Sequence, residues 1–347
     1  MDTPPKLPAG KKSFADVTYD EAMRRAEALI PLLKAHADES EKLTHMAPAV
    51  VSALHESGLL RYMQPKRWGG MELDFVSVFD LPEMLGRGDA SAAWTFTNLA
   101  AHHRLLALWD ARAQEEIWGD DPDMLIASGI AFAQGRAVKT DGGYRITGRW
   151  GFSSGVDVST WNMLACQVFD GDKIVDYRMC LVPLPDFEVI DDWQTLGMRG
   201  TGSRSVKCEN VFVPAHRTQS MFASKPGHEF PGLRINTNPT FKVPASSLGG
   251  HCIAGAITGN AQAAVDTMIE MVKSRSTSYT GANMRDFHSV QFRVGTAAAK
   301  VDAARLILRN DCLQADEMAR AGKTLDLEAK VKNKRNCATA VKLCMEA

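Results

Sequence analysis

The spacing of apolar residues changes twice along this chain, and these two changes restrict its possible folds more than any other feature. From about residue 19 to residue 118 apolar residues recur every three or four positions, as in Ala22, Ala26 and Leu29, which predicts amphipathic helices. After Asp123 short segments rich in β-branched and apolar residues are separated by turn sequences, which predicts strands. The expected strands lie in MLIASGIAF, GYRITGRW, WNMLACQVF, YRMCLVPL and SVKCENVFV. Helical spacing then returns near residue 245.

This order predicts an α+β multidomain fold. We expect an all-α domain over residues 1–122, a β-barrel or β-sandwich over residues 123–230 and a helical bundle over residues 231–347. The bundle helices are expected at about 245–273, 287–321 and 325–347. The last one reaches Ala347 without a capping residue, a glycine or a proline, so we expect the bundle to be incomplete.

Charge and composition argue against several classes of function. The 40 Lys and Arg residues nearly balance the 41 Asp and Glu residues, so no strong field attracts nucleic acid or an anionic membrane surface. The chain has no run of about 18 apolar residues, and its first residues lack the apolar core of a signal peptide, which predicts a cytoplasmic protein. Seven scattered cysteines and nine histidines show no metal-ligand spacing, so we expect buried thiols and no metal site.

The most informative helix is SAAWTFTNLAAHHRLLALW, which is apolar enough to be buried. Trp94, Asn98 and His102 are four residues apart and therefore lie along one side of it. Polar groups on a buried helix need partners, so this stripe is either an internal hydrogen-bond network or part of a functional site. His103 faces about 100° away and is expected to be structural or at the surface.

A second candidate site lies in GRWGFSSGVDVSTW. Ser153 and Ser154 follow Trp150 and Phe152 at the end of an expected strand. Two hydroxyls beside aromatic residues suit a stacked planar heterocycle, although a serine turn between strands explains the pattern equally well. Ser128 lies where another expected strand ends.

Two further features suggest phosphate binding. The glycines and arginines of GMRGTGSRS suit a phosphate, but no helix follows them, so neither the P-loop nor the dinucleotide motif is satisfied. We also expect Met198, within this stretch, to contact the substrate. Arg275 is either a phosphate partner or an ordinary exposed arginine.

The chain resembles the acyl-CoA dehydrogenase superfamily over nearly its whole length. The resemblance lies in the domain order and in the stretches HESGLLRYMQPKRWGGMELD, GRWGFSSGVDVSTW and GMRGTGSRSVKCENVFVPAHR. Its details are more similar to the flavin-dependent monooxygenase branch, which includes the oxygenase components of 4-hydroxyphenylacetate and secosteroid phenol hydroxylases and the dibenzothiophene monooxygenases. ASGIAFAQGRA and GFSSG replace two motifs that are usual in the dehydrogenases. The hydroxylases also carry a tryptophan eight residues before a histidine, like Trp94 and His102.

The resemblance implies roles for individual residues. His102 and Ser154 are the catalytic residues, and Trp94, Asn98 and Ser128 contact the substrate, as we also expect of Met198. The cofactor is bound by Ser153 or Ser154 at the flavin N5 and O4 edge, by Trp150 and Phe152 beside the ring, and by Arg275 at the phosphate of this or a neighbouring subunit.

The resemblance also implies a reaction. Reduced FMN or FAD from a separate flavin reductase reacts with O2, and the resulting flavin C4a-hydroperoxide hydroxylates a phenol-like aromatic ring. His102, with an ordinary pKa near 6.5, is expected to accept the phenolic proton or to anchor the peroxide. An apolar wall of Trp94, Phe96 and Leu99 is expected to exclude water. The resemblance further implies a homotetramer.

Two alternatives stay open. The first is acyl-CoA dehydrogenation, for which Glu270 is the only candidate base, although such a residue is usually a solvated part of a helix. The other alternative is an inactive, truncated flavin-binding fragment.

Overall fold

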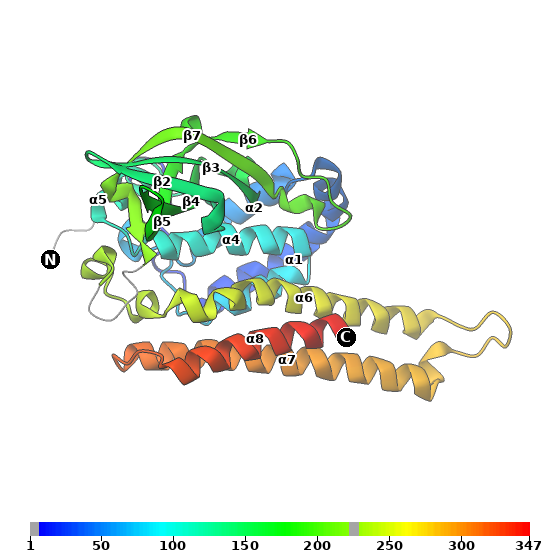
Figure 1. Cartoon of the computed structure of the whole chain (residues 1–347). Coiled ribbons are helices and arrows are strands. Elements are labelled where there is room, and N and C mark those ends of the chain that lie inside the picture. The colour runs from blue at the N-terminus through cyan, green and yellow to red at the C-terminus, as the bar shows by residue number, and fades with distance from the viewer. Residues whose placement is uncertain (1–6, 222–228) are drawn as a thin grey trace. The chain divides into compact units, whose positions relative to one another are not determined.

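The computed structural model of the chain describes residues 7–221 and 229–347 (Figure 1), and it confirms the predicted α+β class. Helices come first, strands follow, and three long helices come last. The first helices are α1 (Tyr19–Leu43), α2 (Pro48–Glu56), α3 (Ser77–Gly86), α4 (Ala90–Leu106) and α5 (Ala111–Trp118). The last are α6 (Ala245–Ser274), α7 (His288–Arg320) and α8 (Leu327–Glu346), close to the predicted bounds.

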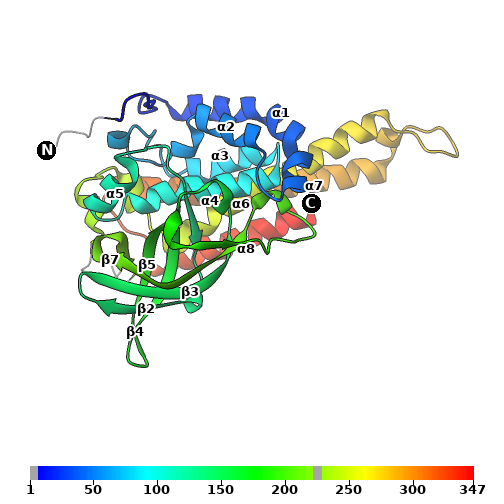
Figure 2. The same cartoon turned by 90° about the horizontal axis from the view of Figure 1, so that it is seen from above.

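The strands form one eight-stranded sheet with the order β6-β7-β3-β2-β4-β5-β8, and β1 pairs with β4 outside this path. Figure 2 shows the paired strands β3 and β7 curving together. The strands are β1 (Ile126–Gly129), β2 (Gly135–Thr140), β3 (Gly143–Ser153), β4 (Trp161–Asp170), β5 (Lys173–Pro183), β6 (Glu188–Ile190), β7 (Arg204–Pro214) and β8 (Thr218–Ser220). Sequence analysis missed β2, β6 and β8.

Strand β4 shows why this sheet is apolar on both faces. Successive side chains of a strand point to opposite faces. Leu164 and Cys166 lie in a core that the sheet itself encloses, with side chains from β1, β2, β3, β5 and β7. Met163 and Ala165 lie in a second core with the end of α4 and with α5. The mainly apolar stretch WNMLACQVF is therefore the expected pattern of a strand that is covered on both sides.

Contacts between residues group the chain into two compact units. The first unit comprises Met1–Ala22, His36–Leu73 and Asn98–Lys242, and it contains the whole sheet. The second comprises Met23–Ala35, Asp74–Thr97 and Val243–Ala347. The boundaries 1–122, 123–230 and 231–347 thus follow the type of secondary structure, whereas the contacts group some early helical segments with the C-terminal helices.

The second unit is held together by close helix packing and by buried polar contacts. The backbone of α3 approaches α6 at Gly259, where an added Cβ would lie 2.0 Å from the carbonyl oxygen of Glu83. Asp311 of α7 accepts hydrogen bonds from Asn336 of α8 at 2.9 Å and lies 3.1 Å from Nε2 of His251 of α6. One network therefore joins all three bundle helices, and Figure 1 shows α8 running beside α7.

The cysteines form no disulfide bonds, as expected for buried thiols. All seven cysteines are free, and Cys166, Cys180, Cys208, Cys312 and Cys344 are buried. Among the residues that the structure describes, no helix is both long enough and apolar enough to cross a membrane.

Candidate active site

Helix α4 carries the predicted stripe. Its side chains are mostly buried, but Trp94 and Asn98 are partly exposed and share one side of the helix. His102, one turn further on, is only 6% exposed. Phe96 and Leu99, expected in the apolar wall, have no exposed surface and belong to the core.

His102 is fixed in one tautomer. Its Nδ1 lies 2.6 Å from the carbonyl oxygen of Ile126, at the start of β1. Because a carbonyl oxygen only accepts hydrogen bonds, the proton of the neutral ring resides on Nδ1 and Nε2 is left as an acceptor. The local structure thus decides which ring nitrogen can serve as a base.

Burial lowers the pKa of His102 to about 4, although the hydrogen bond to Ile126 acts in the opposite direction. The expectation of an ordinary pKa near 6.5 is therefore wrong. At neutral pH the imidazole is uncharged and can accept a hydrogen bond, but it is a weaker base than a solvated histidine.

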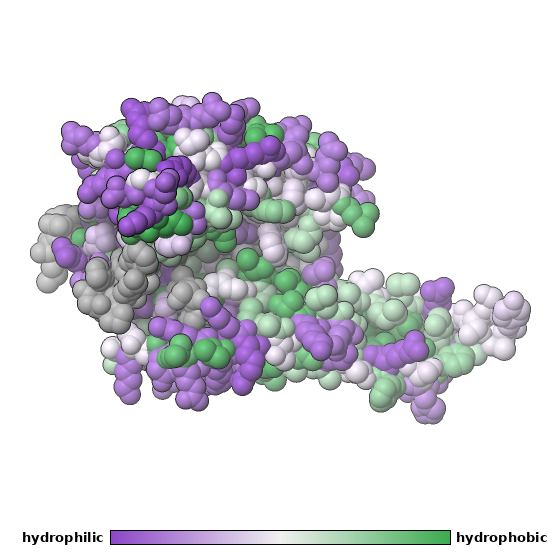
Figure 3. Space-filling view, in the orientation of Figure 1, coloured by the Kyte–Doolittle hydropathy of each residue, from purple (hydrophilic) through white to green (hydrophobic). Residues whose placement is uncertain are grey.

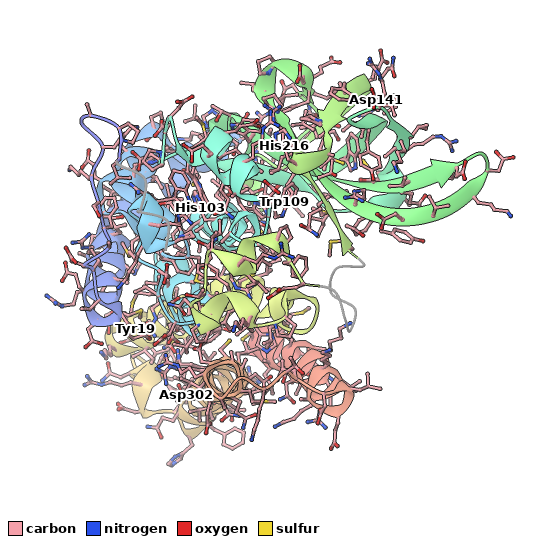
Figure 4. All side chains as sticks on the ribbon, turned by 90° about the vertical axis from the view of Figure 1, so that its left-hand side faces the viewer. Tyr19, His103, Trp109, Asp141, His216 and Asp302 are labelled. Atoms are coloured by element: carbon pink, nitrogen blue, oxygen red, sulfur yellow. The ribbon has the colours of Figure 1, made fainter. Side chains whose placement is uncertain are left out.

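Of the two predicted possibilities for His103 (labelled in Figure 4), the structure shows the structural one. It is fully buried, and its Nδ1 accepts a hydrogen bond of 3.1 Å from the indole N–H of Trp118. The two rings stack with centroids 5.8 Å apart. Burial lowers the pKa of His103 to about 3, so this ring stays neutral.

The serine turn follows a β-bulge at the end of β3. The pairing of β3 with β7 shifts between Trp150 and Ser153, and Phe152 has a φ of 62°, which is rare for a bulky residue. The bulge turns Phe152 outward, where its side chain is 75% exposed. Its ring meets that of Trp193 edge-on, with the ring centroids 6.0 Å apart. The exposed aromatic face of Phe152 is thus produced by a strained backbone position.

Trp150 lies on the opposite side from Phe152, although the two were expected to act together. Its side chain has no exposed surface, and its indole N–H donates to the carbonyl oxygen of Ala165 at 2.7 Å. Glycines make room for it: an added Cβ at Gly135 would lie 2.4 Å from the indole. Trp150 therefore supports the sheet from inside and offers no surface to a cofactor.

Ser153 connects the turn to β4, the strand that pairs with β1 beside His102. Its Oγ accepts a hydrogen bond of 2.8 Å from Nδ2 of Asn162, and both residues are fully buried. Asn162 of β4 is the register partner of Ala127 of β1, the residue next to the carbonyl that binds His102. One strand pair thus positions both His102 and the serine turn.

Ser154 belongs to a line of hydroxyl groups. Its Oγ lies 2.7 Å from Oγ of Ser203, which lies 2.7 Å from Oγ1 of Thr201. Thr201 in turn donates to the carbonyl oxygen of Met198 at 2.9 Å. The backbone N–H of Gly155 also donates to the carbonyl oxygen of Thr201 at 3.0 Å, so a backbone hydrogen bond joins the turn to this loop as well.

The stretch GMRGTGSRS therefore differs from a phosphate site. Nε of Arg199 donates to the backbone carbonyl of Glu41, and Arg204 pairs with Asp157 at 2.6 Å and with Asp191 at 3.2 Å. Both guanidinium groups already have partners within the protein. The stretch instead positions the hydroxyl groups.

The remaining predicted residues are less closely associated. Ser128 is partly exposed and points to the same face of β1 as Ile126, which is the face toward α4. Met198 is 38% exposed, and its carbonyl oxygen accepts the hydrogen bond from Thr201. Trp94 and Arg275 belong to the second unit, where Arg275 is exposed at the end of α6.

Sequence analysis missed Asn162, Thr201 and Ser203. For Asn162 a signal existed, because it is an amide between the apolar residues Trp161 and Met163 of an expected strand and therefore needs a buried partner. Thr201 and Ser203 gave no comparable signal, because Ser203 meets Ser154 across 49 residues of sequence and the two hydroxyls were noted only as part of a glycine-rich stretch.

Comparison with known proteins supports the flavin-dependent monooxygenase class that the sequence resembles. The acyl-CoA dehydrogenase N-terminal domain family matches residues 20–118, and the C-terminal domain family matches residues 251–347. The chain is 33% identical to the flavin-dependent monooxygenase oxygenase subunit HsaA of Rhodococcus jostii, over 90% of this chain and 82% of that protein. It is 29% identical to the oxygenase component of an FADH2-dependent resorcinol hydroxylase of Rhizobium, over 86% and 74%.

Solved structures agree with these relatives. The crystal structure of a 3-HSA hydroxylase from Rhodococcus superposes with a TM-score of 0.89 at 32% identity, covering 94% of this chain and 83% of the other. The chain thus has the acyl-CoA dehydrogenase fold. It belongs, within that superfamily, to the oxygenase subunits of the two-component flavin-dependent monooxygenases that hydroxylate aromatic compounds. The resemblance predicted from sequence is confirmed.

Proposed function

We propose that this oxygenase binds reduced flavin at the Ser153–Ser154 turn and hydroxylates a phenol held by His102. The observation that carries this proposal is the shared support of the two groups. His102 bonds to Ile126, and Ser153 bonds to Asn162, on the paired strands β1 and β4. A neutral acceptor and a serine turn are therefore held in fixed relation by one strand pair.

The residues at the turn fit a flavin. A flavin ring needs an apolar surface and hydrogen-bonding groups along its N5 and O4 edge, and the exposed Phe152 ring and the hydroxyl of Ser154 supply these two features. When bound, reduced flavin supplies the electrons with which O2 is divided between the new hydroxyl group and water.

His102 is suited to orient the substrate. Its Nε2 can accept the hydrogen of a phenolic hydroxyl, which increases the electron density of the ring that is to be oxidised. Because the pKa of His102 is about 4, the imidazole is not consumed by protonation at neutral pH. Asn98 and Trp94 lie one and two turns earlier on α4, where we propose that they contact the rest of the substrate, together with Ser128 and Met198.

The partners are also proposals. We propose that a separate reductase supplies the reduced FMN or FAD, that the protein works in the cytoplasm where that flavin is formed, and that Arg275 binds the cofactor phosphate. We further propose a homotetramer. Its support is the apolar exposed surface of the bundle helices, where Figure 3 shows green patches. This surface includes Met268, Met271, Phe292, Leu306, Leu327 and Val331.

Substitution of His102 tests the proposal. The His102→Ala protein is expected to bind reduced flavin as the wild type does, but to form product at least about ten-fold less per O2 consumed and to release the balance as hydrogen peroxide. Chemically reduced FMN and FAD, a panel of phenols and peroxide detection provide the measurement. His36→Ala, which changes a histidine on α1 that pairs with Glu39, is the control and should couple normally. An unchanged product yield in His102→Ala would remove His102 from the mechanism.

The alternative hypothesis, acyl-CoA dehydrogenation, has little structural support. Its candidate base, Glu270, is an exposed residue that pairs with Lys273 on the surface of α6. Yellow purified protein that is bleached by an acyl-CoA in the absence of O2 would favour this alternative, whereas we expect colourless protein.

A further inference from the structure

Asn162 is a buried amide whose neighbours across the sheet are apolar. It lies near the start of β4, between β1 and β5, and it has no exposed surface. Its register partners on those two strands are Ala127 and Val182, which belong to the apolar core that the sheet encloses. Burial in such surroundings is costly for an amide unless its oxygen and its nitrogen are both hydrogen-bonded.

One of the two polar atoms of this amide has no partner. Nδ2 of Asn162 donates to Oγ of Ser153 at 2.8 Å, but Oδ1 has no hydrogen-bond partner among the residues that the structure describes. An unpaired buried oxygen lowers stability, whereas apolar groups of the same shape in place of both partners can be neutral or stabilising. Stability therefore does not explain why an amide lies here, and the contact with Ser153 is the remaining reason.

Ser153 is the residue at which strand pairing recovers from the bulge. The ladder between β3 and β7 resumes at Ser153, opposite Arg204. Just before it, Phe152 has a φ of 62°, which costs free energy for a side chain of this size and persists only where the surroundings impose it. The hydrogen bond from Asn162 holds Ser153 inside the sheet, between the outward Phe152 and the hydroxyl of Ser154.

We infer that Asn162 is a positioning residue of the cofactor site, which acts through Ser153 at some cost to the stability of the sheet; this inference rests on the proposed function. Without the bond to Ser153, the strain at Phe152 favours a relaxed bulge. The ring of Phe152 then leaves its exposed position, and the hydroxyl of Ser154 moves away from the edge of the flavin. Loss of the amide therefore weakens flavin binding without weakening the fold.

Replacement of the whole polar pair separates these two effects. The double variant Ser153→Ala/Asn162→Leu has neither the unpaired oxygen nor an unpaired hydroxyl. Leucine branches at the same atom as asparagine, and the alanine makes room for its larger methyl groups. Val182→Ala is the matched control, because it changes the same core beside Asn162 without removing a side-chain hydrogen bond.

Three quantities are measured for the wild type and both variants. These are the urea midpoint of unfolding, the anaerobic Kd of chemically reduced FMN and FAD, and the hydrogen peroxide released per O2 consumed with a panel of phenols. The double variant should have a urea midpoint equal to or above that of the wild type. It should nevertheless bind reduced flavin about ten-fold more weakly, as expected for one lost hydrogen bond, and release more peroxide.

Val182→Ala should show the reverse pattern, with a lower urea midpoint because of the cavity and an unchanged flavin Kd. A double variant with the flavin affinity of the wild type would overturn the inference and leave the proposed function standing. A double variant that fails to fold, or that loses stability and affinity together as Val182→Ala might be found to do, would overturn it equally, because the amide would then support only the fold. A wild type that binds neither reduced FMN nor reduced FAD would contradict the proposed function itself, and the inference with it.

Discussion

The bundle helices of the second unit and the serine turn of the first are both well packed. They differ in how far apart in the sequence the residues lie whose contacts form them. Helices α6, α7 and α8 are built from hydrogen bonds between residues four apart, so their sequence spacing reveals them. The turn depends on partners far along the chain: Ser154 bonds to Ser203, 49 residues away, and Arg204 bonds to Asp157, 47 residues away. Local patterns therefore predict the first region and only suggest the second.

The largest expected effect is that of a methyl group added in the loop behind the turn. Gly202→Ala forces a Cβ to within 2.2 Å of Oδ2 of Asp157, displaces the carboxylate from Arg204 and imposes a φ of 52° on alanine. We expect a loss of about 3 kcal/mol in the free energy of unfolding, together with weaker binding of reduced flavin. Urea denaturation and anaerobic flavin titration measure the two effects.

Gly171→Ala is the control for this change. Gly171 has a similar φ of 58°, but nothing lies within 4 Å of an added Cβ. It should show only the backbone cost, about 1 kcal/mol. Equal losses at the two positions would mean that the contacts of Gly202 are unimportant, and the contrast between turn and bundle would lose its main support.

The next effect is a dependence on acid. The folded chain holds His103 neutral with a pKa of about 3, whereas an unfolded histidine titrates near 6.5. Below pH 6.5 the unfolded state therefore binds a proton that the folded state does not, and stability falls as the pH is lowered toward 3. His103→Gln keeps an acceptor for the Trp118 indole but cannot titrate.

Between pH 7 and pH 4.5 the wild type should lose about 2.5 kcal/mol more than His103→Gln, as measured by urea unfolding at each pH. A difference between the two proteins that does not change with pH would contradict the buried, neutral state of His103. The expected pH dependence would sharpen the comparison between the bundle and the serine turn. His102 and His103, both with lowered pKa values, lie in the unit that holds the turn.

The contrast between the bundle and the serine turn explains where prediction from sequence succeeds. Apolar spacing placed the bundle helices within a few residues, and the stripe of Trp94, Asn98 and His102 lies on one helix side as predicted. It failed at Trp150 and Phe152, because one extra residue in β3 reversed the side to which Phe152 points. It also failed for the pKa of His102, which depends on burial by segments distant in sequence. A bulge and a burial environment are properties of the assembled sheet and leave no local pattern.

The smallest expected effect is in the bundle and has the opposite sign. Gly295 lies inside α7, is exposed, and has no atom within 4 Å of an added Cβ. Gly295→Ala should therefore raise the free energy of unfolding by about 0.5 to 1 kcal/mol, because alanine restricts the unfolded chain and favours the helix. Urea denaturation beside Gly202→Ala measures this difference in sign. A destabilised Gly295→Ala protein would instead indicate that another subunit contacts this face of α7, as in the proposed tetramer. The bundle would then depend on partners distant in sequence, as the serine turn does.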